Sequence, residues 1–483
     1  MFFGREDLLE RLNGLWKKSV ASLVTCRGCR RIGKSTLIAE FAQRSRVRFI
    51  KLEGLQPNAN VDNAKQLVAF GRQLAEQTGR ECPHLENWFD AFAALDAAIS
   101  KRAKTVVLID EISWMGKYDP MFAAELKYAW DNRFAKHQRL VMVLCGSVSA
   151  WIDREIIKAK GFVGRPSLNL VVPELPLDEC VKFWGKSGVS MREIVDVLSV
   201  TGGVPKYLEN VDPQMSADEN IRNLCYRPGG LLVDEFNEIF NDVLDANLSN
   251  KRKMLCALVN GARTGQEIAD EVGLAYNGHV IDSLGELEVS GFVAKDNGFN
   301  PITGKMSKIC RYRLSDNYTR FYLKYIDPKR TMIDKDAYRF TSLEELPGWN
   351  AIMGLQFECL VINNLSLLMR HAGIERALLD SAAPFVCREA KKGEGFQIDL
   401  LLKASRSLYV IEIKRKARIG EEIMDEVQAK IRKMSAARQF SVFPILVYEG
   451  ELSRRVPADG FFKDIIDVAS FRKSSVHLSP FLF

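Results

Sequence analysis

The sequence lacks several features that mark membrane, secreted and metal-cluster proteins. None of its apolar runs is longer than a strand, so no segment predicts a membrane-spanning helix. Its first residues, MFFGREDLLERL, are acidic and amphipathic, unlike a secretory signal. The chain has no low-complexity stretch, and its five histidines show no metal-ligand spacing. These absences predict a soluble globular protein with no membrane partner.

Cysteine is present, but its pattern predicts neither disulfides nor a zinc site. The ten cysteines are scattered through segments expected to form core strands and helices. One CxxC, from Cys26 to Cys29, has no second CxxC to pair with and overlaps the loop that begins at Gly28. Buried free thiols are typical of reducing compartments, so we expect a cytoplasmic protein. A net charge of +7 over 483 residues permits a nucleic-acid partner without requiring one.

A phosphate-binding loop near the N-terminus is the most informative motif. Residues 22–41 are typical of a strand, a loop and a helix, and GCRRIGKS matches G-x-x-x-x-G-K-[ST]. Gly28 and Gly33 permit backbone angles that turn successive N–H groups toward a polyphosphate. We expect Lys34 to reach the β- and γ-phosphates and the Ser35 hydroxyl to ligate Mg²⁺. The other predicted ATP-binding residues of the loop are Cys29, Arg30, Arg31, Ile32 and Thr36.

A second motif, TVVLIDEISW at residues 105–114, follows the pattern of a buried parallel strand that ends in two carboxylates. Asp110 is placed to hold Mg²⁺ through water. Glu111 is the expected general base for the water that attacks the γ-phosphate. An acidic turn after a strand is the alternative interpretation. The two motifs together predict a P-loop NTP hydrolase with ATP and Mg²⁺ as cofactors.

Four motifs of the chain resemble the archaeal-type ATPase family, which is close to the STAND and origin-recognition ATPases within the ASCE class. They are the Gly-Arg-Glu box at 4–6, GCRRIGKST, LIDEISW, and TGGVPKYLE at 201–209. The resemblance implies that Arg5 lies near the nucleotide and that Lys206 on a helical lid senses it. An N-terminal helix cap is the alternative role of the first box.

The resemblance implies two further roles at the γ-phosphate. Ser147, after the apolar strand expected at 140–145, is implied to hydrogen-bond the γ-phosphate or the attacking water. Arg165 is implied to reach the γ-phosphate, in cis or from a neighbouring subunit of a homo-oligomer. Capping of a helix by Ser147 and a surface position for Arg165 remain open alternatives.

The segment from about 250 to 327 predicts a winged helix-turn-helix. A capping box of Thr264 and Glu267 starts one helix, another helix is expected at 277–290, and strands are expected at 292–294 and 310–314. The expected recognition helix carries Asp282, Glu286 and Glu288 and no Lys or Arg, which disfavours a DNA major groove. We expect DNA-backbone contact or protein docking instead, through wing cations at Lys295, Lys305, Lys308, Arg311 and Arg313.

The last 140 residues or so contain polar residues inside apolar strand patterns. Asp399 lies in GFQIDLLLK, and Glu412 and Lys414 lie on one face of SLYVIEIKRK. With Glu358 on a preceding helix, this arrangement resembles the PD-(D/E)XK nuclease fold. The resemblance implies that Glu358, Asp399 and Glu412 hold Mg²⁺ and that Lys414 orients water. A solvent-facing pair of Glu412 and Lys414 is the alternative.

Basic residues near this motif predict either a DNA-backbone track or a solvated face. They are Arg415, Lys416, Arg418, Lys430, Arg432 and Lys433.

The whole reading is an α/β protein of four parts. They are a P-loop ATPase domain at 1–175, a helical lid at 176–249, a winged helix-turn-helix at 250–330 and a nuclease-like domain at 345–483. The predicted function is ATP hydrolysis that controls a Mg²⁺-dependent nuclease-like domain acting on DNA. The alternative is an ATP-driven switch or scaffold whose inactive nuclease fold binds nucleic acid or protein.

Overall fold

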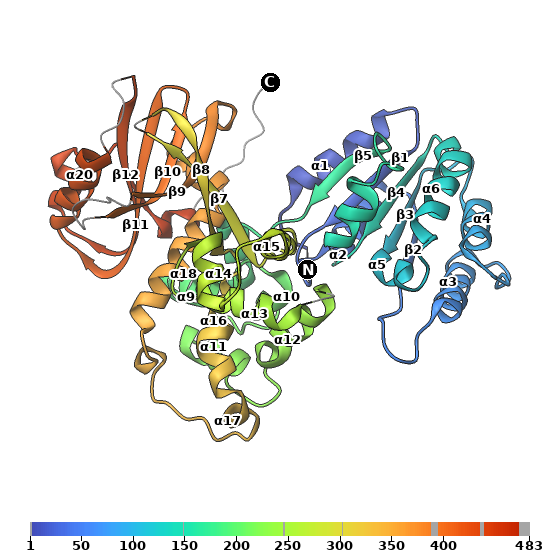
Figure 1. Cartoon of the computed structure of the whole chain (residues 1–483), viewed down its shortest axis with the longest axis horizontal. Coiled ribbons are helices and arrows are strands. Elements are labelled where there is room, and N and C mark those ends of the chain that lie inside the picture. The colour runs from blue at the N-terminus through green and yellow to red at the C-terminus, as the bar shows by residue number, and fades with distance from the viewer. Residues whose placement is uncertain are drawn as a thin grey trace. The chain divides into compact units, whose positions relative to one another are not determined.

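A computed structural model describes residues 2–147, 149–244, 247–301, 303–387, 395–434 and 439–472 (Figure 1). By its internal contacts the chain divides into two compact units. The first comprises Met1–Glu174 with Ile239–Asp245, and the second comprises Leu175–Glu238 with Ala246–Phe483. The second unit therefore contains most of the expected lid, the middle module and the C-terminal domain. Their division into separate domains stays a prediction.

The first unit is built on a five-stranded sheet in the order β2-β3-β4-β1-β5, and all of its strand pairs are parallel (Figure 1). Alternating strands and helices produce this topology because each parallel pair needs a crossover. The carboxyl ends of the strands therefore meet at one edge of the sheet. The strands are β1 (Ser22–Arg27), β2 (Arg48–Glu53), β3 (Thr105–Asp110), β4 (Leu140–Cys145) and β5 (Pro166–Val171).

Buried aromatic side chains fill the core between this sheet and its helices. Trp88 and Phe92 of α4 lie against Phe70 of α3 and Phe122 of α6, with ring centroids between 4.7 and 6.4 Å apart. The helices of this unit are α1 (Glu6–Gly14), α2 (Lys34–Ser45), α3 (Asn63–Thr78), α4 (Trp88–Ala98), α5 (Ile112–Met115), α6 (Phe122–Asn132) and α7 (Ser149–Ile152).

Helices precede and follow the three-stranded sheet of the second unit. Buried amides join three of them, since Gln356 Nε2 of α18 donates to Asn317 O at 2.7 Å and Asn317 Nδ2 of α16 donates to Ser199 O of α9 at 3.2 Å. The helices from the lid region onward include α8 (Leu177–Cys180), α9 (Met191–Thr201), α10 (Pro205–Leu208), α11 (Ala217–Cys225), α12 (Leu231–Val243), α13 (Leu248–Ala257), α16 (Asn317–Phe321), α17 (Arg330–Asp334), α18 (Trp349–Asn363) and α19 (Leu365–His371).

The middle module has short helices and a three-stranded sheet in the order β6-β8-β7. The predicted capping box is present, because Thr264 and Glu267 cap the start of α14 reciprocally. Its elements after α13 are β6 (Arg263–Thr264), α14 (Gly265–Val272), α15 (Gly278–Val289), β7 (Val293–Asn300) and β8 (Lys305–Leu314). The β7–β8 hairpin is longer than the strands expected from the sequence.

The C-terminal domain contains a mixed sheet in the order β13-β12-β11-β10-β9 (Figure 1). Strands β9, β10 and β11 are antiparallel neighbours, whereas β12 pairs in parallel with both β11 and β13. Helix α20 (Glu422–Met434) forms the crossover from β11 to β12. The strands are β9 (Leu379–Cys387), β10 (Phe396–Ala404), β11 (Ser407–Ile419), β12 (Ser441–Leu452) and β13 (Asp464–Asp467).

The β7–β8 hairpin packs against this C-terminal sheet. Phe299 of β7 is 4% exposed and belongs to the same apolar cluster as Ile398 and Leu401 of β10. Its ring lies 5.6 Å from that of Phe440, and Lys403 Nζ lies 5.5 Å from its centroid. The middle module and the C-terminal sheet therefore share a hydrophobic core.

Within the described ranges, no single helix has the length and apolar character needed to cross a membrane. Only α18 and α19 taken together reach that length and composition, and they are bent by 75° at their junction.

Candidate functional site

The loop between β1 and α2 requires glycine at both ends. Gly28 has φ +150°, and a Cβ there would lie 2.5 Å from Val172 O, closer than real Cβ atoms come to a carbonyl. Gly33 has φ +86° directly before the first residue of α2. Between them Arg31 also adopts positive φ, at 63°. The expected phosphate-binding conformation is therefore built from backbone angles that favour glycine.

The reactive side chains of the loop point to its interior and to β3. Lys34 is 6% exposed, and its Nζ donates to Gly28 O and to Cys29 O, both at 3.0 Å. Ser35 Oγ donates to Asp110 Oδ2 at 2.5 Å. The structure thus brings together the lysine, hydroxyl and carboxylate that two distant motifs predicted.

Glu111 and Ser147 are in direct contact. The Glu111 Oε2 atom accepts the Ser147 backbone N–H at 3.0 Å and the Ser147 hydroxyl at 2.8 Å. Glu111 itself has φ 48°, an uncommon angle for a residue with a side chain, directly after the end of β3. The Ser147 hydroxyl is therefore hydrogen-bonded to the predicted general base, Glu111.

The donor set at this edge of the sheet fits Mg²⁺. Ser35 and Asp110 offer a hydroxyl and a carboxylate that already touch. Mg²⁺ prefers oxygen ligands and is usually held by one or two protein groups together with nucleotide phosphates and water. Ser35 and Asp110 would hold the ion, as the sequence predicts.

Arg5 is hydrogen-bonded to the phosphate loop. Its guanidinium donates to Ile32 O and to Pro173 O, both at 2.8 Å, and the residue is 8% exposed. Arg5 therefore lies beside the phosphate loop with its charged group on backbone carbonyls, and its proximity to the nucleotide stays a prediction. The rest of the box differs, since exposed Glu6 pairs with Arg44 at 2.9 Å.

Two other predicted cations are engaged elsewhere. Arg165 lies directly before β5, and its Nε and Nη2 atoms donate to the two carboxylate oxygens of Asp131 at 2.6 and 2.8 Å. This guanidinium lowers the pKa of the Asp131 carboxyl below its usual value. Lys206 belongs to α10 in the second unit, where its Nζ lies 3.5 Å from a Glu209 carboxylate oxygen. Nucleotide contacts by Arg165 and Lys206 stay predictions.

Lys51 is a residue of this site that sequence reasoning missed. Its Nζ lies 3.3 Å from Asp110 Oδ2 and 2.6 Å from Glu53 Oε2. Strand β2 neighbours β3, with Glu53 in register with Asp110. In the sequence, only the charges of Lys51 and Glu53 near the end of β2 indicated a polar site here. Local sequence does not show which strands are neighbours in the sheet, so the contact with Asp110 could not be predicted.

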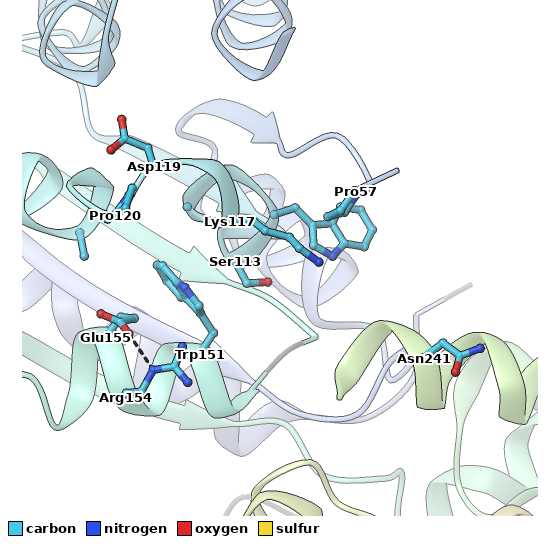
Figure 2. A pocket seen from close by; sticks show the side chains of 12 residues that line it. Pro57, Ser113, Lys117, Asp119, Pro120, Trp151, Arg154, Glu155 and Asn241 are labelled. Carbon is cyan, nitrogen blue, oxygen red and sulfur yellow. Dashed lines mark hydrogen bonds and ion pairs between the residues drawn. The ribbon is translucent and has the colours of Figure 1, made fainter. Parts of the chain in front are cut away.

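A cavity of about 420 Å³ opens beside the turn that follows Glu111. Figure 2 shows the Ser113 side chain between those of Trp151 and Lys117. Arg154 and Glu155 also line the cavity. Ser113 Oγ is buried and has no hydrogen-bond partner among the described residues. Nothing in the motifs pointed to this cavity, whose lining comes from α5, α7 and the segments around them.

The predicted polar residues of the C-terminal domain also come together. Asp399 lies on β10 and Glu412 and Lys414 on the adjacent β11. Asp399 Oδ2 accepts the Ile413 N–H at 2.8 Å, and Lys414 Nζ lies 2.7 Å from Glu412 Oε1. Glu412 is 0% exposed, so the alternative of a solvent-facing Glu412–Lys414 pair is wrong.

Helix α20 adds an unexpected cation to this centre. Lys430 Nζ donates to both carboxylate oxygens of Glu412 at 2.7 Å. In the described part of the chain, no three His, Cys, Asp or Glu side chains form a group able to hold a metal ion. The carboxylates expected to bind Mg²⁺ therefore do not fit that ion as they are arranged, because the protein's own ammonium groups occupy Glu412.

Burial perturbs the two remaining carboxyl groups. It raises the pKa of Glu358 to about 7, with a further contribution from the negative charge of Asp399. It likewise raises the pKa of Asp399 to about 6, and the Glu412 carboxylate adds to this shift. These charge effects show that Glu358 of α18 belongs to the same cluster of carboxyl groups as Asp399 and Glu412.

Several basic residues of the predicted wing and of the predicted track or solvated face form ion pairs within the protein. Arg415 pairs with Asp196 and lies 3.4 Å from Glu449. Arg313 of the hairpin forms an ion pair with Asp296 at 2.9 Å, and Arg311 lies 3.6 Å from Glu267. The Lys308 side chain lies outside the described residues. Lys416 and Arg418 remain exposed on β11.

Comparisons with known proteins find a family match for the N-terminal part of the chain. Residues 2–211 match the family described as an ATPase domain predominantly from Archaea. An uncharacterized protein of Methanocaldococcus jannaschii is 24% identical over 367 residues, which cover 74% of this chain and 76% of that protein. The match over 2–211 supports the ATPase domain predicted from the motifs.

Two solved structures have limited similarity to the chain. A Walker-type ATPase of Pyrococcus abyssi has a TM-score of 0.49 and 16% identity, with coverage of 67% of this chain and 96% of that one. The ORC2 protein of Aeropyrum pernix, solved in ADPNP–ADP complexes, has a TM-score of 0.39 and 15% identity, with coverage of 68% and 93%.

We expect Glu358→Gln to change how stability depends on pH. The folded pKa of Glu358, about 7, lies above the unfolded value of roughly 4.3. The folded state therefore keeps a proton that the unfolded state releases, and the free energy of unfolding falls as pH rises between these values. Glutamine has no carboxyl proton to lose. The free energy of unfolding of the variant should therefore exceed that of wild type by on the order of 1–2 kcal/mol at pH 8.

Urea unfolding at pH 5, 6, 7 and 8 measures this difference. The exposed Glu344→Gln is the matched control and should follow the wild-type profile. Parallel pH profiles for Glu358→Gln and wild type would show that the buried carboxyl is not protonated as we infer.

Proposed function

We propose that this protein binds and hydrolyses ATP at the carboxyl edge of its parallel sheet. The observation that carries the proposal is the contact of Ser147 with Glu111, next to the hydrogen bond between Ser35 and Asp110. A nucleotide-binding protein that does not hydrolyse has no need of a positioned general base. The family match over residues 2–211 supports the same conclusion.

The roles of the residues follow from their positions. The loop N–H groups and Lys34 bind the phosphates, which requires the lysine to leave the Gly28 and Cys29 carbonyls that it contacts now. Glu111 takes a proton from water as its oxygen attacks the γ-phosphorus, and the bond to the bridging oxygen breaks to release ADP and phosphate. Ser147 orients Glu111 until then. Bound Mg²⁺ supplies charge neutralisation at the phosphates.

Arg165 keeps its proposed role at the γ-phosphate, and Lys206 keeps its proposed role as a sensor of the nucleotide. For Arg165 to reach a phosphate, the bidentate pair with Asp131 must open. This requirement is compatible with a contact made across subunits of a homo-oligomer, which would compete with Asp131 for the guanidinium.

Phosphate release by the full chain tests ATP hydrolysis. Glu111→Gln should lower the rate by roughly 10²-fold or more and leave ATP binding intact, since only the base is lost. Lys34→Ala should weaken ATP binding as well as turnover. Glu76→Gln, an exposed change on α3, is the control and should hydrolyse at the wild-type rate. Wild-type turnover by Glu111→Gln would contradict the proposal.

We propose for the second unit a nuclease-like domain that acts on DNA under control of the ATP site. The specific observation is the cluster of Glu358, Asp399, Glu412 and Lys414 on α18, β10 and β11, in a sheet where α20 forms the parallel crossover. The alternative is an ATP-driven switch whose C-terminal domain binds nucleic acid or protein without cleaving it.

Cleavage of plasmid, linear duplex and single-stranded DNA, with Mg²⁺ or Mn²⁺ and with or without ATP, separates these functions. We expect Glu412→Gln to abolish cutting and Lys34→Ala to change only its dependence on ATP. If wild type and every variant leave all three DNA forms uncut while ATP is hydrolysed, the switch is the correct function.

A further inference from the structure

The Glu412 carboxylate is enclosed by cations that belong to the protein. It is 0% exposed, and both of its oxygens lie 2.7 Å from Lys430 Nζ. Lys414 Nζ contacts Oε1 at the same distance of 2.7 Å. A buried carboxylate needs such partners, because an unpaired charge in the interior is strongly unfavourable.

The two lysines differ in how they are held. Lys414 follows Glu412 by two residues on β11, so the strand fixes it on the same face as the carboxylate. Lys430 reaches Glu412 from α20, an element 18 residues further along the chain. The two side chains are similarly exposed, 21% for Lys430 and 22% for Lys414, so the difference lies in the element that carries each of them. Lys430 can therefore leave through a side-chain rotation, without movement of the sheet.

The position of Lys430 conflicts with metal binding. A divalent cation that shares Asp399 and Glu412 needs at least one Glu412 oxygen, and both carry a short contact to the same ammonium. Lys414 already contacts Oε1, so a metal ion would be a third cation at this carboxylate, and its repulsion by both ammonium groups disfavours binding.

We propose that the Lys430 ammonium is a built-in occupant of the cation position in the C-terminal centre. A divalent cation binds at Asp399 and Glu412 only when Lys430 is displaced, so α20 controls access of metal to the site. The inference rests on the proposed nuclease-like function in assigning a cation to this centre. It goes beyond that function by naming the residue that keeps the centre closed.

Mn²⁺ binding to the full chain tests the inference, measured from the electron paramagnetic resonance signal of free Mn²⁺. All variants carry Asp110→Asn and no nucleotide is added, which removes the carboxylate assigned to metal binding in the ATP site. Lys430→Met should bind Mn²⁺ at least about 10-fold more tightly than the parent, because the competing charge is gone. Lys430→Arg keeps a cation in place and should bind as weakly as the parent.

Two controls separate this effect from a general change of charge or fold. Lys433→Met on the same helix removes the same charge at an exposed position and should leave Mn²⁺ affinity unchanged. Adding Glu412→Gln to Lys430→Met should remove the gained affinity. Lys430→Gln, which keeps a polar head against Glu412, replaces Lys430→Met if the latter unfolds.

Equal Mn²⁺ affinity in the parent and in folded Lys430→Met or Lys430→Gln would overturn the inference. So would a gain of the same size in Lys433→Met. Cleavage of DNA does not enter this measurement. Tight Mn²⁺ binding by Lys430→Met without DNA cleavage therefore supports the lysine inference and removes only the proposed nuclease.

Discussion

The parallel arrangement of β1, β3 and β4 is the constraint on which the ATP site depends. Parallel neighbours end at the same edge of a sheet, so residues far apart in the chain meet there. Lys34 and Ser35 follow β1, Glu111 follows β3, and Ser147 follows β4. The hydrogen bonds from Ser35 to Asp110 and from Ser147 to Glu111 join these strand ends. An antiparallel pair in the middle of the sheet would separate them.

In each of the two polar centres, a lysine ammonium group is hydrogen-bonded to oxygen atoms of the protein. In the first unit Lys34 donates to loop carbonyls where phosphates would be bound. In the second, Lys430 neutralises Glu412 where a cation is expected. A flexible ammonium suits both positions, because its long stem allows it to move when a ligand of suitable charge arrives. Lys34 would thus turn toward a negatively charged phosphate, whereas Lys430 would be displaced by a positively charged metal ion.

The sequence was most informative where chemistry and spacing are local. The phosphate loop needs Gly28, Gly33 and Lys34 at fixed offsets, and Glu412 and Lys414 share a strand face because they are two residues apart. Contacts between distant elements could not be read in this way. Lys430 was predicted to belong to a DNA-backbone track or a solvated face, because nothing in the α20 sequence shows that this side chain faces Glu412. The pairing of Arg165 with Asp131 and the burial of Phe299 against β10 likewise depend on how elements pack.

A structure of the full chain crystallised with Mg²⁺ and a non-hydrolysable ATP analogue tests the central claim most directly. We predict phosphates cradled by the 28–35 loop, Lys34 turned from its carbonyls to the phosphates, and Ser35 bound to the metal with Asp110 beside it. Glu111 should then face the water next to the γ-phosphate. A nucleotide bound elsewhere, or an unchanged Lys34 and Ser35 at saturating analogue, would contradict the account.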